Sequence, residues 1–306
     1  MSTKLWGVAG VAEPASRDSR SPQPVSFTWV RGEMLEKRSD VFLGLSSSTG
    51  EILVAKRYTF DETETPGRPS ARSIKAEVAL LQHIRHPNLV EVFGFDEQSD
   101  AFHVLSEYVP GNTLRLEIHR RGQLAEDIVQ SIASQLLDGL IHLHARGIVL
   151  GDLKSTKILV DPSGVCKIAG LGCSSASSSG SGEGSLVRRD YSRAVPKAIW
   201  WTAPEVVRGQ FKAWSLPADI WSLGCVVLEM LTGLRPWFDT EAVAVMFKLY
   251  HQTLRPEVPP GIILSPVAAD FLNMCLAVNP EDPMSAAELR KHPFLAQAAP
   301  FSGFNA

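Results

Sequence analysis

The 306-residue sequence lacks any apolar run near the roughly 20 residues that a membrane-spanning helix requires. It also lacks an excess of basic charge, because 30 Lys and Arg residues are balanced by 33 Asp and Glu residues and leave a formal net charge of −3. A basic surface field is what attracts nucleic acids and anionic membranes. We therefore predict that neither a nucleic acid nor a membrane is a partner of this protein.

Cysteine is scarce, and its four copies are far apart in the sequence, at Cys166, Cys173, Cys225 and Cys275. They form no Cys-x-x-Cys pair, and the eight histidines show no spacing typical of a zinc site. Reduced, buried thiols in a cytosolic protein are the expected state. The short apolar stretch Leu5–Ala12 follows a single lysine and is weaker than a secretory signal, so we predict a cytoplasmic location.

The first third of the chain changes character at about residue 27. Residues 1–26 are rich in Ser, Pro, Ala and Arg, which is typical of a disordered segment. Apolar runs bounded by turn residues then predict strands, and apolar residues at helical spacing predict one helix. The predicted strands are 41–43, 52–55, 89–95 and 102–108, and the predicted helix is 73–85, after a polar loop at 61–70.

The rest of the chain has mostly helical patterns. A long helix is predicted over residues 128–146, followed by a hairpin of strands 158–160 and 165–168. A Ser/Gly-rich flexible loop is predicted at 174–185, and helices dominate from there to residue 295. The pattern indicates an α+β protein with a small strand-rich lobe at 27–108, a larger helical lobe at 109–296 and a tail at 297–306.

Several short motifs occur in one order along residues 28–295. They are Val54-Ala55-Lys56, the helical Glu77, Ser106-Glu107-Tyr108-Val109, Asp152-Leu153-Lys154, Ala203-Pro204-Glu205 and Asp219-Ile220-Trp221-Ser222-Leu223-Gly224. In this order and spacing the chain resembles the eukaryotic protein kinase family. Trp29–Glu33 and Met230–Trp237 most resemble fungal kinase kinase kinases of mitogen-activated cascades.

The resemblance implies a two-lobed kinase-like fold, with a small antiparallel sheet and one main helix in the first lobe, and an ATP site between the lobes. Lys56 matches the lysine that holds the α- and β-phosphates, and Glu77 matches the glutamate that orients it. Asp152 matches the acceptor of the substrate hydroxyl proton, and Lys154 matches a γ-phosphate contact. The adenine site would be formed by Leu35, Val41, Val54, Ser106, Glu107, Val109 and Leu159.

The sequence departs from the family where phosphate and metal are bound. Glu36 and Arg38 replace the first two glycines of a phosphate-binding loop that is also two residues shorter. Lys157 and Gly170 replace the two magnesium ligands of the family. A loss of one stabilising group typically costs about 10²–10³ in rate, so two such losses would take a kinase below useful turnover.

Regulatory and core positions also differ from the family. Gly151 replaces the arginine that reads a phosphorylated activation loop, and Ala198 replaces a hydroxyl that contacts the catalytic Asp. Leu150 and Leu171 replace His and Phe but keep apolar bulk, and with Leu81 and Val92 they align with the stack that joins the two lobes. Pro283 replaces the arginine that pairs with Glu205, for which we expect Arg255 or Arg208 as the substitute partner, or else a looser corner of the lobe.

These differences predict a pseudokinase that acts as a scaffold or allosteric partner in signalling. ATP would bind weakly and without magnesium, and the partners would be proteins, including kinases of the same cascade. Two alternatives stay open. The chain could be an active or weakly active Ser/Thr kinase in which Lys157 serves as an internal cation, or a decaying paralogue without a selected role.

Overall fold

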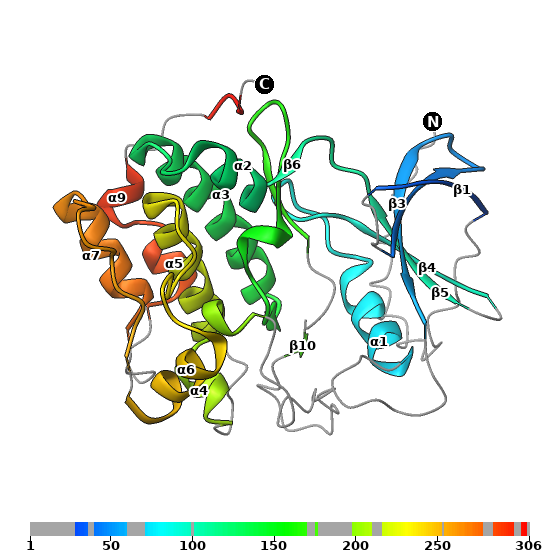
Figure 1. Cartoon of the computed structure of the whole chain (residues 1–306). Helices are drawn as coiled ribbons and strands as arrows, with labels where there is room; N and C mark the ends of the chain where they lie inside the picture. Colours follow the sequence, from blue (N-terminus) through cyan, green and yellow to red (C-terminus); the bar gives the residue numbers. More distant parts are fainter. Residues whose placement is uncertain are drawn as a thin grey trace, which may run out of the picture.

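The computed structural model describes residues 28–35, 40–59, 71–98, 101–169, 175–176, 198–209, 216–252, 254–277, 284–296 and 301–304. Gly170, Leu171, Glu36 and Arg38 lie outside these residues, as do Cys173 and Pro283. The helices and strands form a smaller sheet-containing lobe and a larger helical lobe (Figure 1). The predicted α+β fold is confirmed. Among the described helices, none is both long and apolar enough to cross a membrane.

The smaller lobe contains one antiparallel sheet with the strand order β1-β2-β3-β5-β4. Its strands are β1 (Trp29–Met34), β2 (Val41–Ser46), β3 (Ile52–Tyr58), β4 (Val92–Glu97) and β5 (Phe102–Glu107). The predicted strands correspond to β2 to β5. The sequence pattern does not predict strand β1, because five of its six residues are exposed and it lacks a clean apolar alternation.

Helix α1 (Ala71–Leu81) packs against β4 (Figure 1). Its buried residues Ile74, Val78 and Leu81 follow the predicted helical spacing. The helix ends at Leu81, so the predicted extension to residue 85 is wrong. The chain turns there, with Ile84 N–H donating to the Leu81 carbonyl at 2.9 Å, before Pro87 disfavours helix at the residue that precedes it.

Residues 108–111 lead from β5 into the larger lobe, and they require a glycine at their end. Gly111 has φ +117°, and a Cβ on it would lie 2.1 Å from the Val160 carbonyl oxygen. Directly after it, β6 (Asn112–Thr113) pairs with β8 (Ile158–Val160), which in turn pairs with β9 (Cys166–Ile168). The predicted hairpin of residues 158–168 is confirmed, and its turn is closed by the Asp161 carboxylate, which accepts the N–H groups of Ser163 and Val165.

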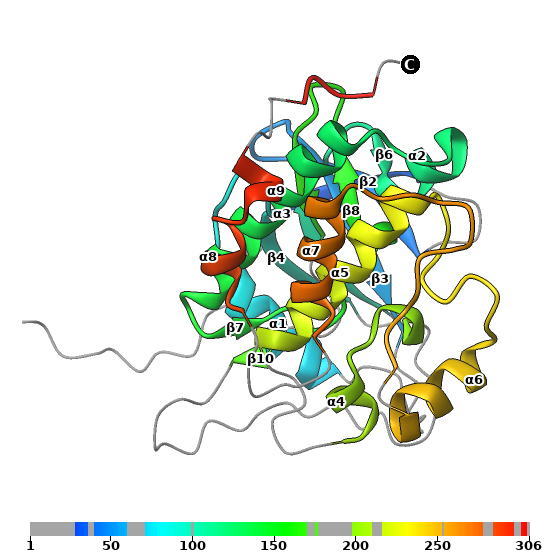
Figure 2. The same ribbon diagram turned by 90° about the vertical axis from the view of Figure 1, so that its left-hand side faces the viewer.

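The larger lobe is built around α5 (Leu216–Thr232), which is buried along nearly its whole length and packs against α3 and α7 (Figure 2). Helix α3 (Glu126–His144) confirms the long predicted helix and begins two residues earlier than expected. The other α-helices are α2 (Leu114–Arg121), α4 (Pro204–Val207), α6 (Ala242–Phe247), α7 (Pro266–Cys275), α8 (Ala286–Leu289) and α9 (Pro293–Ala296). The described part of this lobe also contains two 3₁₀ turns, η1 (Ser155–Lys157) and η2 (Ile199–Trp201), and a π-helical turn, η3 (Lys248–Gln252).

A short strand corrects part of the predicted flexible loop. Ser175 and Ala176 form β10, which pairs antiparallel with β7 (Ile148–Val149). The pairing with a buried strand overrides the local Ser/Gly composition at these two residues. The other residues of the predicted loop at 174–185 lie outside the described part of the chain.

One hydrophobic core joins the two lobes. Leu81 and Val92 from the smaller lobe and Leu150 from the larger lobe are buried in the same cluster. Backbone hydrogen bonds add to this contact, because Ile168 N–H donates to the Asn88 carbonyl and Val90 N–H donates to the Ile168 carbonyl. Three of the four residues predicted for the interlobe stack therefore lie in one core, and the fourth, Leu171, is outside the described residues.

Candidate active site

Three of the predicted adenine-binding residues of the sheet, Val41, Val54 and Ser106, share one of its faces with Lys56. Val54 is directly opposite Ser106 on β5, and Lys56 is directly opposite Val41 on β2. Because side chains alternate along a strand and opposite residues share a face, these four side chains are on the same side of the sheet. Leu35 follows β1 beside them, since its N–H donates to the Val41 carbonyl at 3.0 Å.

The remaining predicted adenine-site residues lie where the two lobes connect. Val109 is buried, and Leu159 is half-buried on β8, opposite Lys167 of β9. The carboxylate of Glu107 accepts the N–H of Glu91 at 3.1 Å and pairs with the Lys167 ammonium at 2.5 Å. The side chain of Glu107 thus links Glu91, which directly precedes β4, and Lys167 of β9 to the connection between the lobes.

Lys56 and Glu77 stand on β3 and α1 of the smaller lobe. The Lys56 ammonium lies 5.1 Å from the centre of the Tyr58 ring. Glu77 lies on the buried side of α1 and is only 4% exposed. The role of Glu77 in orienting Lys56 toward the phosphates stays a prediction.

Asp152 lies between two ammonium groups. Lys154 Nζ is 3.0 and 3.1 Å from its carboxylate oxygens, and Lys157 Nζ is 2.8 Å from one of them. Burial raises the pKa of Asp152, but the Lys157 and Lys154 ammonium groups outweigh burial, so the pKa of this carboxyl lies below its ordinary value. The three side chains are less than one-fifth exposed and carry a combined charge of +1.

The residues just before Asp152 are held by a different carboxylate. Asp219 is fully buried in the first turns of α5, and it accepts the N–H of Leu150 at 2.9 Å and that of Gly151 at 2.8 Å. Its carboxylate is also 2.9 Å from His144 Nε2 at the end of α3. Gly151 has φ +78°, a left-handed backbone conformation that favours glycine. Asp219 therefore orders the backbone of this loop without help from Asp152.

A second fully buried carboxylate, Glu229, joins four segments of the larger lobe. It accepts hydrogen bonds from Arg115 of α2 at 2.7 Å, Ser155 of η1 at 3.0 Å and Trp201 of η2 at 3.1 Å. Burial raises the pKa of Glu229, and the hydrogen bonds from Arg115, Ser155 and Trp201 only partly offset this rise. The sequence motifs assign Glu229 no role, because its three partners become visible as partners only in the folded chain.

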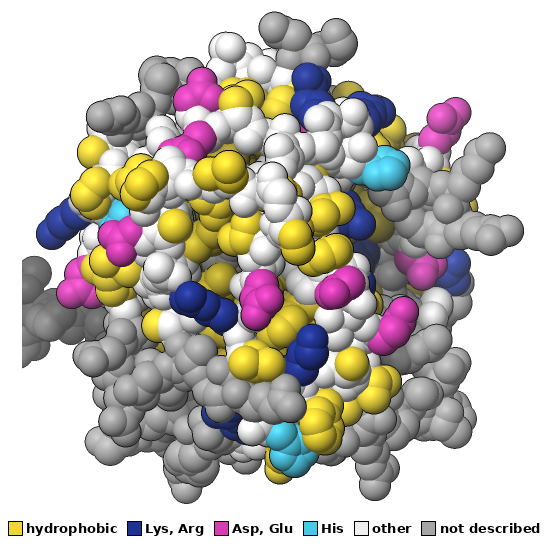
Figure 3. Space-filling view, turned by 60° about the vertical axis from the view of Figure 1, so that its left-hand side comes forward, with side chains coloured by type: hydrophobic (Ala, Val, Ile, Leu, Met, Phe, Trp, Pro, Cys, Tyr) yellow, Lys and Arg dark blue, Asp and Glu magenta, His cyan; other side chains and the backbone are white. Residues whose placement is uncertain are grey.

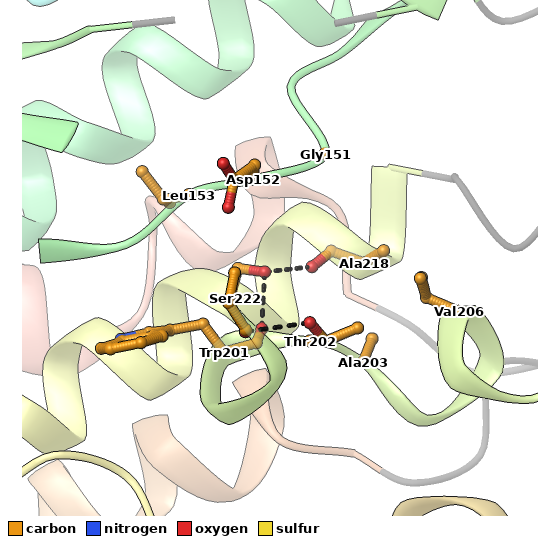
Figure 4. A pocket seen from close by; sticks show the side chains of 10 residues that line it. Gly151, Asp152, Leu153, Trp201, Thr202, Ala203, Val206, Ala218 and Ser222 are labelled. Atoms are coloured by element: carbon orange, nitrogen blue, oxygen red, sulfur yellow. Dashed lines mark hydrogen bonds between the residues drawn. The ribbon is translucent and has the colours of Figure 1, made fainter. Parts of the chain in front are cut away.

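A pocket opens beside Asp152, between the loop, η2 and α5 (Figure 4). Its hydroxyl groups already bond to the backbone, since Ser222 donates to the Trp201 and Ala218 carbonyls and Thr202 donates to the Ala198 carbonyl. Asp152 is the charged side chain among those that line it. The lining residues are Gly151, Asp152, Leu153, Ala198, Trp201, Thr202, Ala203, Val206, Ala218 and Ser222.

Neither of the two cations expected as substitute partners forms an ion pair with Glu205 among the described residues. Arg255 instead donates to the Asn273 side chain at 2.7 Å. Arg208 donates to the Leu249 and Tyr250 carbonyls, at 3.1 Å each. Burial raises the pKa of Glu205, and its own backbone N–H and the Arg208 charge only partly offset this rise. Within the described part of the chain, no cation forms an ion pair with Glu205.

Comparison with known proteins agrees with these motifs. The sequence profile of the family described as protein kinase domain matches residues 37–295. The chain is 35% identical to "MAP kinase kinase kinase mkh1" of Schizosaccharomyces pombe, over 96% of this chain and 27% of that protein. It is 31% identical to "Serine/threonine-protein kinase BCK1/SLK1/SSP31" of Saccharomyces cerevisiae, over 95% of this chain and 20% of that protein.

A plant protein is similar over a comparable region. "Mitogen-activated protein kinase kinase kinase YODA" of Arabidopsis thaliana is 34% identical over 89% of this chain and 30% of its own length. The chain spans less than a third of the length of each of these three relatives. The predicted similarity to fungal kinase kinase kinases is confirmed.

Proposed function

Because this chain belongs to the protein kinase family, we propose that it is a catalytically impaired member, a pseudokinase that acts by binding other proteins. The observation that carries this proposal is the contact between Lys157 and Asp152 at 2.8 Å. An ammonium group stands where the resemblance implies a magnesium ligand, and it neutralises the carboxylate that would accept the substrate proton.

The donor set does not fit a magnesium ion. Mg²⁺ prefers oxygen ligands in near-octahedral geometry. Lys157 offers a positive charge in place of an oxygen, and Gly170 has no side chain to offer. Asp152, Lys154 and Lys157 together carry a charge of +1, which further disfavours a divalent cation. These residues therefore support no phosphoryl-transfer step through a metal.

Weak, metal-free binding of ATP is compatible with the site. Val41 and Val54 present apolar side chains on the face of the sheet that also carries Lys56. Adenine stacking needs mainly such apolar surface, whereas the triphosphate needs charge neutralisation. Lys56 and Lys154 would supply that charge without a metal, so we expect the nucleotide to bind weakly.

The partners that we propose are proteins of a kinase cascade. Two of the three relatives carry names of mitogen-activated or MAP kinase kinase kinases, and we infer from these names that this chain acts in a related cascade. A scaffold or allosteric role requires an assembled fold, and the shared core of the two lobes supports that requirement. The exposed side of α1 and the larger lobe are the surfaces on which we expect contacts.

Thermal shift with ATP, with and without magnesium, tests the metal-site argument. The wild-type protein should be stabilised slightly by ATP, with no further gain from magnesium. The double variant Lys157→Asn, Gly170→Asp restores both family ligands and should gain magnesium-dependent stabilisation. A matched control, Lys291→Asn with Ala287→Asp, makes the same charge change at exposed positions of the larger lobe and should gain none. Magnesium-dependent stabilisation of the wild-type protein would contradict the proposal.

The second candidate function is an active or weakly active Ser/Thr kinase with atypical phosphate coordination. Asp152 and Lys154 lie in contact, and Asp152 borders the pocket of Figure 4, which favours this candidate. A radiolabelled phosphate-transfer assay on a basic protein separates the two. We expect the same background signal from the wild type and from Asp152→Asn. A wild-type signal that Asp152→Asn abolishes would establish the active kinase.

A further inference from the structure

Helix α6 and the π-helical turn η3 carry apolar residues on two opposite sides. Val245 and Leu249 are fully buried against the larger lobe. Val243, Phe247 and Tyr250 are 64%, 55% and 51% exposed, and their spacing of four and three residues places them in one row, which we call the outer stripe. A helix that is apolar on all sides is normally covered on all sides. The outer stripe is thus an apolar surface that lacks a cover within the described residues.

The outer stripe is held in a fixed conformation. Arg208 of the neighbouring α4 segment donates to the backbone carbonyls of Leu249 and Tyr250 in η3. The His251 ring lies 4.5 Å from the Phe247 ring and 4.7 Å from the Tyr250 ring, so the aromatic side chains support one another. Ordered aromatic side chains lose little conformational entropy on binding, and they are enriched among the residues that dominate interfaces.

Exposed charges of opposite sign precede and follow the outer stripe. Asp239 and Glu241 are exposed before α6, while Arg255 is exposed after η3, two residues before the exposed Glu257. Within the described residues, Asp239, Glu241 and Arg255 form no ion pair. In an antiparallel arrangement about a two-fold axis, Glu241 of one copy can face Arg255 of the other, so these two charges favour a second copy of the chain as the cover.

We propose that a second copy of this chain covers the outer stripe and forms an antiparallel homodimer with Phe247 near the two-fold axis. The stripe lies at the end of the larger lobe remote from the sheet of the smaller lobe (Figures 1 and 2), so the dimer leaves the nucleotide site open. Hydrophobic side chains also reach the surface along the lower part of the face in Figure 3. This self-association is independent of the proposed loss of catalysis, because it uses none of the residues around Asp152.

Sedimentation velocity of the full chain, from about 1 to 200 µM, tests the dimer, because a small interface of this kind gives a concentration-dependent equilibrium. The mass should rise from monomer toward dimer. Phe247→Glu should weaken association at least tenfold, since it places a charge at the centre of an apolar contact. Val30→Glu is the matched control, because Val30 is similarly exposed, at 61%, but lies in the smaller lobe, and it should leave association unchanged. A monomer throughout this range, or a dimer that Phe247→Glu does not weaken, would overturn the proposal.

A charge exchange tests the antiparallel geometry without changing the apolar contact. Glu241→Arg and Arg255→Glu should each weaken association, because each places like charges opposite one another. The double variant restores opposite charges across the two-fold axis and should recover association toward the wild-type level. A double variant that associates no better than the single variants would show that these two ends do not meet.

Discussion

The two halves of the loop that runs from Ile148 to Lys157 are organised by opposite arrangements of charge. In the first half, the carboxylate of Asp219 accepts hydrogen bonds from the backbone N–H groups of Leu150 and Gly151. In the second half, the ammonium groups of Lys154 and Lys157 form ion pairs with the carboxylate of Asp152. The first arrangement orders the backbone of the loop, whereas the second pairs the side chain of Asp152 with two cations. The backbone of the loop and the charge of Asp152 are therefore stabilised by separate groups.

The two arrangements also differ in how much they stabilise the fold. Asp219 is fully buried, so each of its hydrogen bonds replaces solvation that the carboxylate has lost. Asp152 is 16% exposed, and its partners are 19% and 17% exposed. Water therefore weakens the pairs around Asp152 more than the hydrogen bonds around Asp219. We expect stability to depend mainly on the first half of the loop.

Asp219→Ala should have the largest effect on stability, because it removes the support of the first half of the loop. It leaves the buried N–H of Leu150, the half-buried N–H of Gly151 and His144 without their acceptor, which should cost about 3–5 kcal/mol of unfolding free energy. Urea unfolding followed by circular dichroism measures this loss. Asp270→Ala is the matched control, because Asp270 also pairs with a histidine, His292 at 3.2 Å, but is 59% exposed. The control should cost about 1 kcal/mol or less. Equal losses for the two variants would contradict the role given to Asp219.

Asp152→Asn should have a smaller effect, and one that depends on pH. The Lys157 and Lys154 charges hold the pKa of Asp152 below its ordinary value, so the ionised carboxylate stabilises the folded state. This contribution is present above the unfolded pKa of about 4 and is lost as the pH falls through the lower folded pKa. Asp152→Asn should therefore cost about 1–2 kcal/mol at pH 7 and progressively less below pH about 4. Urea unfolding at several pH values measures the difference, and a cost that grows on acidification would show that the ammonium groups do not dominate.

Local patterns in the sequence predict the elements that depend on nearby residues alone. Helix α3 follows from its apolar spacing, and the β8–β9 hairpin follows from the turn residues between Asp161 and Gly164, the latter with φ +86°. Strands β1 and β10 are not predicted, because they form by pairing with β2 and β7 and their local composition does not indicate a strand. Local patterns carry no information about such partners.

The same limit applies to the candidate site. Short motifs identify Asp152, Lys154 and the replacement at Lys157, but the contact of Lys157 with Asp152 depends on the fold of η1. The roles of Asp219 and Glu229 depend on hydrogen bonds between residues 69 and 114 positions apart, Leu150 with Asp219 and Arg115 with Glu229. A buried acidic residue inside the apolar pattern of α5 is the available signal, and it indicates a structural carboxylate before any partner is known.

Glu205 offers the smallest and most selective test of the comparison, because its own backbone N–H and the Arg208 charge only partly offset its burial, and no cation among the described residues forms an ion pair with it. Burial raises its pKa, so the folded state favours the protonated form, and the stabilisation from that form is full below the unfolded pKa of about 4 and is lost as the pH rises through the folded pKa. Glu205→Gln resembles the protonated form at every pH. It should therefore raise the unfolding free energy at pH 7 by about 1 kcal/mol or less, and the gain should vanish below pH about 4. The effect is opposite in sign to that of Asp152→Asn and is read from the same urea series. A loss of stability in Glu205→Gln at pH 7 would mean that a cation supports this carboxylate after all.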